Sequence, residues 1–366
     1  MVRLLAVLSM GFGLVTLAGR LEAAPARVLA PVVAPRALAA DGAYGPDGSL
    51  HLVLARADGC VHVSRAAGSA GFGPEHAIPA AGQPAVGGER RPHLLADRAG
   101  RLFALWQTRQ GIVLAVSADA GVNWTLRSTG ALTAKTGADV FNAALSADGV
   151  LYLVWAGEKD PHLPDDDVAQ HLYLASSADG GGTFTEPRAI TTDATRACPC
   201  CVPAITTGRP GEVWVAYRSS AANIKETRVL ASTDAGRTFT SSQLSNHRWE
   251  FQGCPMQGPA IAVASPHVIV SWTSNGDMYT SSSSDGGKSY SAPQRLGRGR
   301  FNQVVASATG TILQVWDEGT RTGVWWRADA QPSARVSLKP GGALLAAPDG
   351  RFELLGSGDD GKHHGH

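Results

Sequence analysis

Four of the five cysteines in this 366-residue chain lie in two short segments. Cys198, Cys200 and Cys201 form a Cys-x-Cys-Cys pattern, and Cys254 occurs in a later segment with Met256 two positions beyond it. Thiols and thioethers support three kinds of chemistry: they form disulfides, exchange electrons, and bind soft metal ions. The cysteine count is odd, so at least one thiol is unpaired, bound to a metal or bonded to another molecule.

Three interpretations of this pattern stay open. In the first, Cys200 or Cys201 pairs with Cys254 and staples two parts of the fold, which stabilises a protein by about 2–4 kcal/mol. In the second, the thiolates of Cys198, Cys200, Cys201 and Cys254, with the Met256 thioether, bind a soft metal ion, for which Cu(I) is favoured over Zn(II). In the third, two of the thiols form a redox-active pair.

Histidines extend the metal hypothesis. His247 and His162 are candidates for completing a metal shell, and the polar tail over residues 359–366 ends in a His-rich run that could collect metal. Such a short His-rich tail is often only a solvated surface. Cys60 lies far from the other cysteines along the chain, and we expect it to be a lone thiol or a buried apolar residue.

The elements that must position the cysteines are signalled by an internal repeat. The pattern Ser-x-Asp-x-Gly-x-x-aromatic occurs four times, at starts 51 to 60 residues apart. Aspartate accepts hydrogen bonds from turn amides, glycine takes a positive φ, and the aromatic side chain packs beneath the turn, so each copy predicts a hairpin. The copies are Ser117–Trp124, Ser177–Phe184, Ser232–Phe239 and Ser283–Tyr290.

An apolar strand, in most cases ending on an aromatic residue, precedes each repeat, and the same feature occurs in two further places. These strands are Leu50–Leu54, Leu102–Trp106, Leu151–Trp155, Val213–Tyr217, Val268–Trp272 and Ile312–Trp316. Six sheet units at this interval predict an all-β, six-bladed β-propeller over residues 31–358, with the recurring tryptophans in its core. Residues 343–355 supply two more strands that could close the ring against the N-terminal blade.

In a propeller, the innermost strand of each blade begins at the central opening. The predicted units place Cys198–Pro203 at the start of blade four and Cys254–Pro259 at the start of blade five. Because these blades are neighbours, we expect their cysteines to meet. The long insertion Glu158–Asp167 from blade three reaches the same rim, either as a lid with acidic ligands or as a solvated loop.

The repeats resemble the Asp box of the sialidase superfamily. Around Arg90, the segment 88–94 resembles the Arg-Ile-Pro motif of that superfamily, which puts Arg90 in the place of the carboxylate-binding arginine. Arg218 and Arg300 are candidates for the other two arginines of a bidentate clamp. The resemblance therefore implies one candidate activity, an exo-α-sialidase-type glycoside hydrolase acting on acidic sugars.

Other parts of the sialidase machinery do not match. The resemblance calls for an acidic residue where the short turn Gln107–Gly111 carries none, and for a tyrosine nucleophile where blade six has Phe301–Gln303. The Cys-x-Cys-Cys pattern followed by Cys-Pro resembles a group of secreted sialidase-like proteins. We therefore predict a non-hydrolytic propeller that binds copper, zinc or a small ligand in its central funnel, with a scaffold for an envelope protein, stapled by disulfides, as a further alternative.

The N-terminus and the charge balance bear on location and partners. Residues 1–23 have the features of a cleavable signal peptide, so we expect a secreted or periplasmic protein with no membrane span. The chain has 32 basic and 31 acidic residues, and loss of Arg3, Arg20 and Glu22 with the signal leaves 30 of each. A net charge near zero gives no attraction to nucleic acid.

Overall fold

The computed structural model describes residues 32–33, 37–79, 82–87, 89–127, 129–133, 136–159, 162, 169–318, 322–326, 334–336 and 343–356. The predicted signal peptide, the His-rich tail and most of the insertion Glu158–Asp167 lie outside the described residues. Within them, the chain is almost entirely β-structure: six sheets of four consecutive antiparallel strands, and one three-stranded sheet. This arrangement confirms the predicted all-β propeller with six repeated units.

The six repeated sheets, which we call blades one to six, follow one another along the chain. Their strands are β2 (Ala39–Tyr44), β3 (Leu50–Arg56), β4 (Gly59–Arg65) and β5 (His76–Ala77); β6 (His93–Ala96), β7 (Leu102–Thr108), β8 (Gly111–Ser117) and β9 (Thr125–Arg127); β10 (Phe141–Leu145), β11 (Leu151–Lys159), β12 (Gln170–Ser177) and β13 (Arg188–Ala189); β14 (Ala204–Thr207), β15 (Val213–Ser219), β16 (Ile224–Ser232) and β17 (Thr240–Gln243); β19 (Ala260–Ala264), β20 (His267–Ser274), β21 (Asp277–Ser283) and β22 (Gln294–Arg298); β23 (Arg300–Ala306), β24 (Ile312–Asp317), β25 (Thr322–Trp326) and β26 (Ala334–Val336). A short strand, β18 (Trp249–Glu250), also pairs with β16, and a one-turn helix, α1 (Gly130–Thr133), follows blade two.

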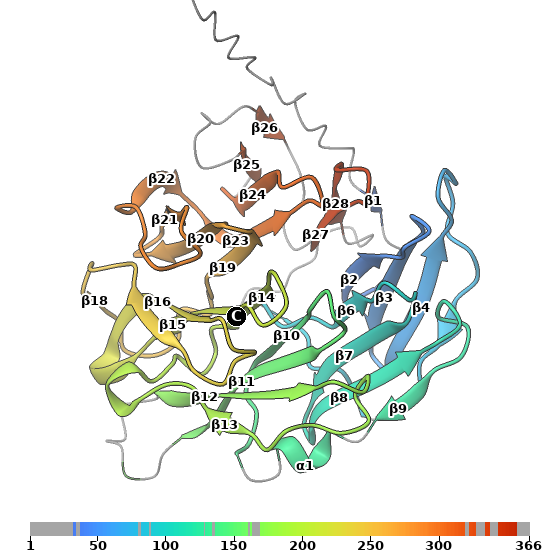
Figure 1. Cartoon of the computed structure of the whole chain (residues 1–366), viewed down its shortest axis with the longest axis horizontal. Helices are drawn as coiled ribbons and strands as arrows, with labels where there is room; N and C mark the ends of the chain where they lie inside the picture. The colour runs from blue at the N-terminus through green and yellow to red at the C-terminus, as the bar shows by residue number, and fades with distance from the viewer. Residues whose placement is uncertain are drawn as a thin grey trace, which may run out of the picture.

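The three-stranded sheet closes the ring. It consists of β27 (Ala343–Ala346), β28 (Phe352–Gly356) and, parallel to β28, the N-terminal β1 (Val32–Val33). The innermost strands contact one another in the order β2, β6, β10, β14, β19, β23 and β27, and β27 returns to β2. Figure 1 shows this closing sheet between the first and sixth blades. The two closing strands predicted near the C-terminus are thus confirmed.

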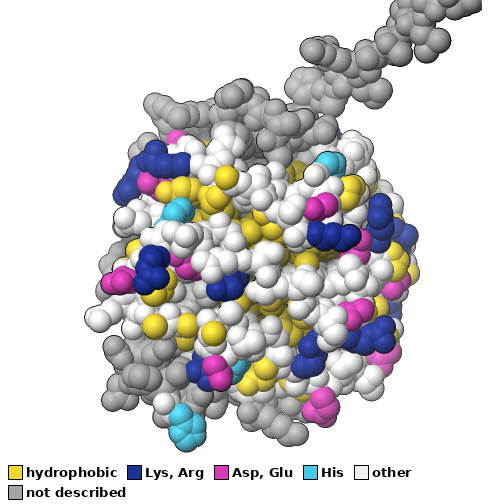
Figure 2. Space-filling model, turned by 60° about the vertical axis from the view of Figure 1, so that its left-hand side comes forward, with side chains coloured by type: hydrophobic (Ala, Val, Ile, Leu, Met, Phe, Trp, Pro, Cys, Tyr) yellow, Lys and Arg dark blue, Asp and Glu magenta, His cyan; other side chains and the backbone are white. Residues whose placement is uncertain are grey.

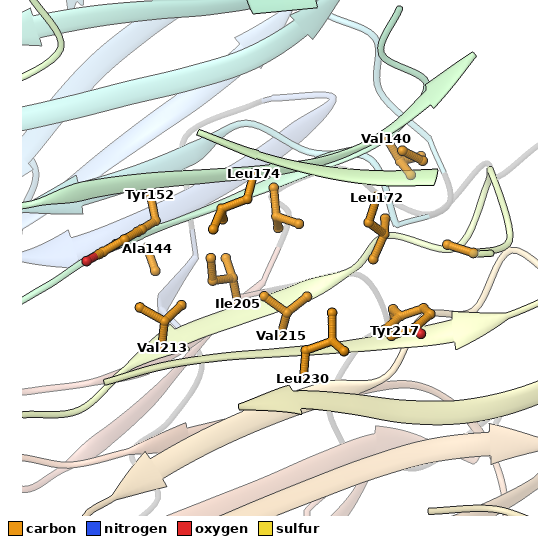
Figure 3. Packing of buried hydrophobic residues seen from close by; sticks show 13 residues of the cluster. Val140, Ala144, Tyr152, Leu172, Leu174, Ile205, Val213, Val215, Tyr217 and Leu230 are labelled. Carbon is orange, nitrogen blue, oxygen red and sulfur yellow. The ribbon is translucent and has the colours of Figure 1, made fainter. Parts of the chain in front are cut away.

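The core lies between successive blades. Figure 3 shows the cluster between blades three and four, in which Val213 and Val215 of β15 face Leu172 and Leu174 of β12. The alternate residues of β15, among them Trp214, face the next cluster, between blades four and five. Because both faces of a middle strand are buried, its sequence is a continuous apolar run. The recurring tryptophans are all buried, as predicted: Trp106, Trp155, Trp272 and Trp316.

The four sequence repeats form one kind of turn, between the third and fourth strands of blades two to five. In each, the serine Oγ accepts the N–H of the glycine four residues later at 2.8–2.9 Å. The aspartate Oδ1 accepts the N–H of the residue four positions beyond it, at 2.8–3.0 Å. By strand order these turns lie on the face opposite the starts of the inner strands.

Charged side chains of both signs are scattered among uncharged ones on the face that Figure 2 shows. No helix among the described residues is long and apolar enough to cross a membrane.

Candidate sulfur site at the central opening

The cysteines of blades four and five meet where their inner strands begin. Cys200 lies shortly before β14, Cys254 shortly before β19, and a disulfide joins them with Cα atoms 6.2 Å apart. This bond confirms the first interpretation of the pattern for Cys200, and it links two neighbouring blades at the opening. It also corrects the predicted metal set, because the bonded Cys200 and Cys254 have no thiolate to offer a metal ion. Cys60 is a free, buried thiol in blade one, as predicted.

Two further thiols lie against the disulfide. The Sγ atom of Cys198 is 3.9 Å from that of Cys200 and 3.8 Å from that of Cys254. The sulfurs of Cys198, Cys200 and Cys201 all lie within 4.8 Å of one another. Cys198 and Cys201 are free thiols, 0% and 3% exposed, whereas both disulfide cysteines are partly exposed. The free thiols are therefore the buried side of the sulfur cluster.

The surroundings of the cluster separate the acidities of its two free thiols. The hydrogen bond from the Cys201 thiol, the charges of Lys225 and Arg218, and the Cys200 amide together lower the pKa of Cys198 to about 6, against the opposing effect of burial. Burial and the neighbouring Cys198 sulfur raise the pKa of Cys201 well above its usual value. Cys198 is thus the thiol that ionises first, with Cys201 as its hydrogen-bond donor.

Lys225 is fully buried, and its Nζ donates to the Ser220 hydroxyl. A buried ammonium group is costly unless a negative group lies near it. The sulfur of Cys198 supplies such a group when it ionises, and this makes Lys225 part of the site's charge balance.

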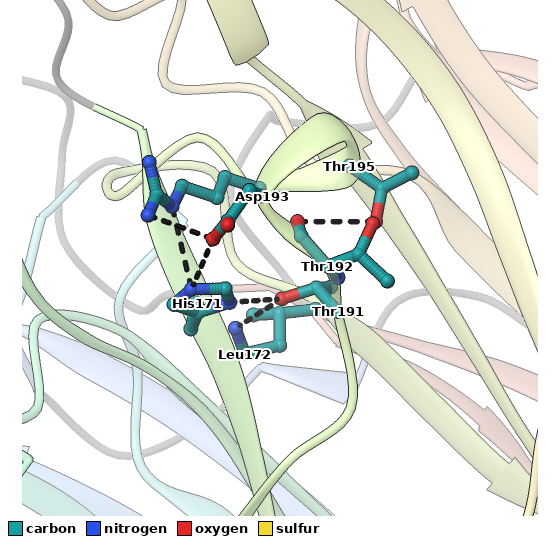
Figure 4. Close-up of polar contacts among 7 residues, drawn as sticks. His171, Leu172, Thr191, Thr192, Asp193 and Thr195 are labelled. Atoms are coloured by element: carbon teal, nitrogen blue, oxygen red, sulfur yellow. Dashed lines mark hydrogen bonds and ion pairs between the residues drawn. The ribbon is translucent and has the colours of Figure 1, made fainter. Parts of the chain in front are cut away.

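The segment that leads to the cysteines is fixed to blade three. Figure 4 shows Thr191, whose Oγ1 accepts the Leu172 N–H at 3.0 Å and lies 3.2 Å from His171 Nδ1. Asp193 Oδ1 pairs with Arg196 Nη2 at 2.8 Å and with His171 Nε2 at 3.3 Å. These contacts hold the loop just before Cys198 against β12.

The next residues are held from both sides. Ala197 bridges Gln170 at the start of β12 and Ser219 at the end of β15. The Cys198 N–H donates to the Arg218 carbonyl at 2.8 Å. The backbone at Ala197 and Cys198 is therefore paired with both blade three and blade four, and this fixes the first cysteine of the cluster.

Arg218 is 1% exposed, and it connects blade four with blade five. Its Nε and Nη2 donate to the Gln257 carbonyl at 3.0 and 2.9 Å, and Nη2 also donates to the Thr273 carbonyl at 2.6 Å. The guanidinium carbon lies 5.2 Å from the ring centroid of Trp249. These contacts hold Arg218 in place beside the sulfurs and direct its donors at main-chain oxygens.

Glu89 is a member of the site that the sequence did not reveal. Its Oε2 accepts the Gly258 N–H at 2.6 Å, and its carboxylate also accepts the Val202 N–H. Burial of the carboxyl group, followed by the nearby Cys201, raises the pKa of Glu89 to about 8, although these two amides and Arg218 act in the opposite direction. The residue as a whole is partly exposed, so its carboxyl end is the part that is enclosed.

Glu89 belongs to the segment that precedes β6 of blade two, yet its partners lie at blades four and five. Arg91 on the same segment reaches blade six, where its Nη1 lies 3.4 Å from Gln303 Oε1. The segment therefore crosses the central opening. A Cβ atom on Gly258 would lie 2.0 Å from the Val202 carbonyl, so this close approach requires glycine there.

The three arginines proposed as a clamp lie in different surroundings. Arg218 is buried and bonded to the main chain, as described above. The side chain of Arg300 is 56% exposed, pairs with Asp317 at 3.4 Å and lies over the ring of Phe301. Arg90 is exposed. A carboxylate clamp of these arginines stays a prediction.

The remaining proposed ligands lie toward solvent. The Met256 side chain is 48% exposed, and its backbone adopts a positive φ of 52°. The ring of His247 packs at 4.4 Å from that of Tyr279 on blade five, and His162 is exposed. Their binding to a metal ion at the cluster stays a prediction.

The layout of the repeat carried a signal for both Lys225 and Glu89. Lys225 is the second residue of the third strand of blade four, β16, and the loop between second and third strands returns to the face where inner strands start. Glu89 is adjacent to Arg90, which the sequence places at the start of blade two. The position of each residue in the repeat was the signal for its place at the opening, and residue type alone gave no such signal.

Comparisons with known proteins show likeness of fold. No protein-family model and no curated protein sequence matches this chain. A protein of unknown function from Dyadobacter fermentans is 14% identical, with a TM-score of 0.50, over 88% of this chain and 95% of that one. An α-L-arabinanase from Penicillium chrysogenum is 14% identical, with a TM-score of 0.48, over 75% and 84% of the two chains. A sialidase from Trypanosoma rangeli is 12% identical, with a TM-score of 0.48, over 77% of this chain and 55% of its own.

Proposed function

We propose that this protein is an exported, sialidase-like Asp-box propeller that binds one soft metal ion, Cu(I), at the thiols of Cys198 and Cys201. The observation that carries the proposal is a cluster of sulfur atoms within 4.8 Å of one another, in which these two thiols are free and buried. Thiolates are the ligands that Cu(I) prefers, and Zn(II) is the second metal that suits them.

The spacing of the sulfurs fits such a site. Thiolates bound at about 2.3 Å to one ion lie about 3.8 Å apart in a tetrahedral shell and about 4.6 Å apart in a linear one. The sulfurs of Cys198 and Cys201, the two proposed ligands, lie within 4.8 Å of one another, which is compatible with either arrangement.

The charges near the sulfurs also fit. Two thiolates and one Cu(I) carry a net charge of about −1, which is costly to bury without a compensating cation. Arg218 and the buried Lys225 lie close enough to Cys198 to favour its ionised form. These two cations would stabilise the deprotonated thiols, and the metal ion would be the protein's cargo.

Three features support a non-hydrolytic role over a sialidase-type hydrolase. The hairpin between β7 and β8 turns through Arg109 and Gln110 alone, so it offers no acidic side chain. Strand β23 has Phe301 and Gln303 where the resemblance calls for a tyrosine. Arg218 donates to carbonyls instead of facing an open funnel.

The metal proposal predicts a copper content for the mature protein isolated without a tag from the exported fraction. We expect about one equivalent of copper per chain by elemental analysis, because two thiolates on one ion make a single site. Cys198→Ser and Cys201→Ser should each lose most of it, since one thiolate is then missing.

Cys60→Ala is the matched control, because Cys60 is also a free, buried thiol but lies in blade one. It should keep the full copper content. If the isolated protein contains no metal and both thiols are free, the copper proposal is wrong. The remaining candidates are then a scaffold for an envelope protein and a propeller that binds a sugar. Zinc in place of copper would keep the site and correct the ion.

A further inference from the structure

The sulfur cluster has an exposed side and a buried side. The disulfide between Cys200 and Cys254 is partly exposed, and Cys198 lies beneath it with almost equal distances to its two sulfur atoms, 3.9 and 3.8 Å. Cys201 donates a hydrogen bond to Cys198 from the buried side. A thiol in contact with a disulfide can attack it once its side chain turns to bring the three sulfurs into line, and a second thiol is in place to resolve the product.

We propose that this cluster carries out internal thiol–disulfide exchange, in which the bond moves from Cys200–Cys254 to Cys198–Cys201. This activity goes beyond metal binding and needs no metal. Among the cysteines, only Cys200 and Cys254 are reachable from solvent. An external reactant would therefore meet this pair: a dithiol would reduce it, and a disulfide would oxidise it.

The exchange balances in two steps. In the first, the Cys198 thiolate attacks Sγ of Cys254; the Cys198–Cys254 bond forms, the Cys200–Cys254 bond breaks, and Cys200 leaves as a thiolate. In the second, Cys201 passes its proton to Cys200 and attacks Sγ of Cys198; the Cys198–Cys201 bond forms and Cys254 leaves as a thiolate. No electron is gained or lost overall, because one disulfide replaces another.

Chain geometry favours this order. Attack on Cys200 would close a disulfide across a single intervening residue, which departs strongly from relaxed disulfide geometry, so Cys254 is the better target. The final pair has the Cys-x-x-Cys spacing that suits a reversible disulfide.

The proposal predicts that Cys254 becomes free without any reductant. Metal-free mature protein is incubated folded with iodoacetamide, and mass spectrometry of its peptides follows alkylation of Cys254 with time. In the wild-type protein, the Cys254 thiol released by exchange should be alkylated steadily. In Cys198→Ser this should be at least about ten-fold slower, because the nucleophile is gone.

Cys201→Ser provides a second readout. Exchange should stop after the first step, so Cys254 should be found bonded to Cys198, with Cys200 alkylated instead. Cys60→Ala should behave like the wild type. Equal alkylation of Cys254 in the wild type and Cys198→Ser, or none in either while circular dichroism shows both folded, would overturn the proposal. Since metal is absent throughout, the copper proposal can fail or stand without affecting this result.

Discussion

At the scale of single residues, Arg218 is the side chain on which the opening depends most. It is buried, and its hydrogen bonds go to the carbonyls of Gln257 and Thr273, which belong to the neighbouring blade. Loss of a buried charged donor leaves those oxygens without their partner. We predict that Arg218→Met lowers the free energy of unfolding by about 3 kcal/mol or more, measured by urea denaturation.

Arg300→Met is the matched control for that prediction. Arg300 is more than half exposed, and exposed ion pairs such as the one with Asp317 contribute about 0–1 kcal/mol. If the two variants lose similar stability, Arg218 is not the structural link between blades four and five. A loss of acidic-sugar binding in both, with little loss of stability, would instead favour the clamp.

At the scale of elements, the seam between blades one and two holds a buried chain of histidines. Ser49 Oγ lies 2.8 Å from His51 Nε2, and His51 Nδ1 lies 3.0 Å from His62 Nε2. The His62 ring packs against Gly121, in the repeat turn of blade two, so closely that a Cβ there would lie 2.1 Å from it. The two blades are thus joined by side chains that pack as neutral imidazoles.

Protonation should weaken this seam. Burial, with the nearby His51 and His76, lowers the pKa of His62 from 6.5 to about 4. The folded state therefore resists a proton that the unfolded state accepts, so stability is complete above pH 6.5 and falls as the pH drops toward 4. The expected loss is about 3 kcal/mol, because each pH unit between the folded and unfolded pKa values of His62 is worth about 1.4 kcal/mol.

The measurement is the free energy of unfolding from pH 7.5 to pH 4, in the wild type and in His62→Gln. The variant should show a shallower decline, because the titrating ring is gone while an amide N–H can still donate to His51. His247→Gln, on an exposed histidine, serves as control and should follow the wild type. A His62→Gln curve parallel to that of the wild type would mean that this seam does not respond to pH.

At the scale of the whole molecule, the ring is held shut by β27. Adjacent leucines on this strand face opposite neighbours: Leu344 packs with the Leu313 cluster of blade six, and Leu345 with the Leu50 cluster of blade one. Both are nearly buried. Strand β2 admits Leu345 because Gly42 has no Cβ, which would lie 3.0 Å from that leucine.

We therefore predict that Leu344→Ala and Leu345→Ala each lower the free energy of unfolding by about 2–4 kcal/mol, as expected for truncation of a buried leucine. Leu126→Ala, on an exposed leucine of β9, should cost well under about 1 kcal/mol. Thermal unfolding followed by calorimetry gives these values. Small losses in both β27 variants would show that the closing sheet contributes little to the ring.

The sequence predicted the blades well because a blade is a local structure. Its four strands follow one another, and the repeat turn at Asp179 or Asp234 makes its hydrogen bonds within a few residues. The meeting of Cys200 with Cys254 followed from blade order, which is also simple. Contacts between residues on opposite sides of the ring could not be predicted, because they depend on the course of loops, which the repeat pattern does not determine.

Glu89 and Arg218 illustrate that limit. The contact of Glu89 with Gly258 joins a blade-two segment to blade five, across the central opening. Arg218 was predicted to bind a ligand carboxylate in the funnel, and the structure adds donors that meet the carbonyls of blade five. The packing of side chains decides which group an arginine contacts. The spacing of residues in the sequence does not predict that partner.

The most direct test of the central claim is an anaerobic titration of the mature, metal-free protein with Cu(I) in the presence of a coloured chelator that competes for it. We predict that the wild type withholds one equivalent from the chelator, and that Cys198→Ser and Cys201→Ser withhold much less. If the chelator takes all the copper from the wild type, or if both variants compete as well as the wild type does, the sulfur cluster is not a copper site.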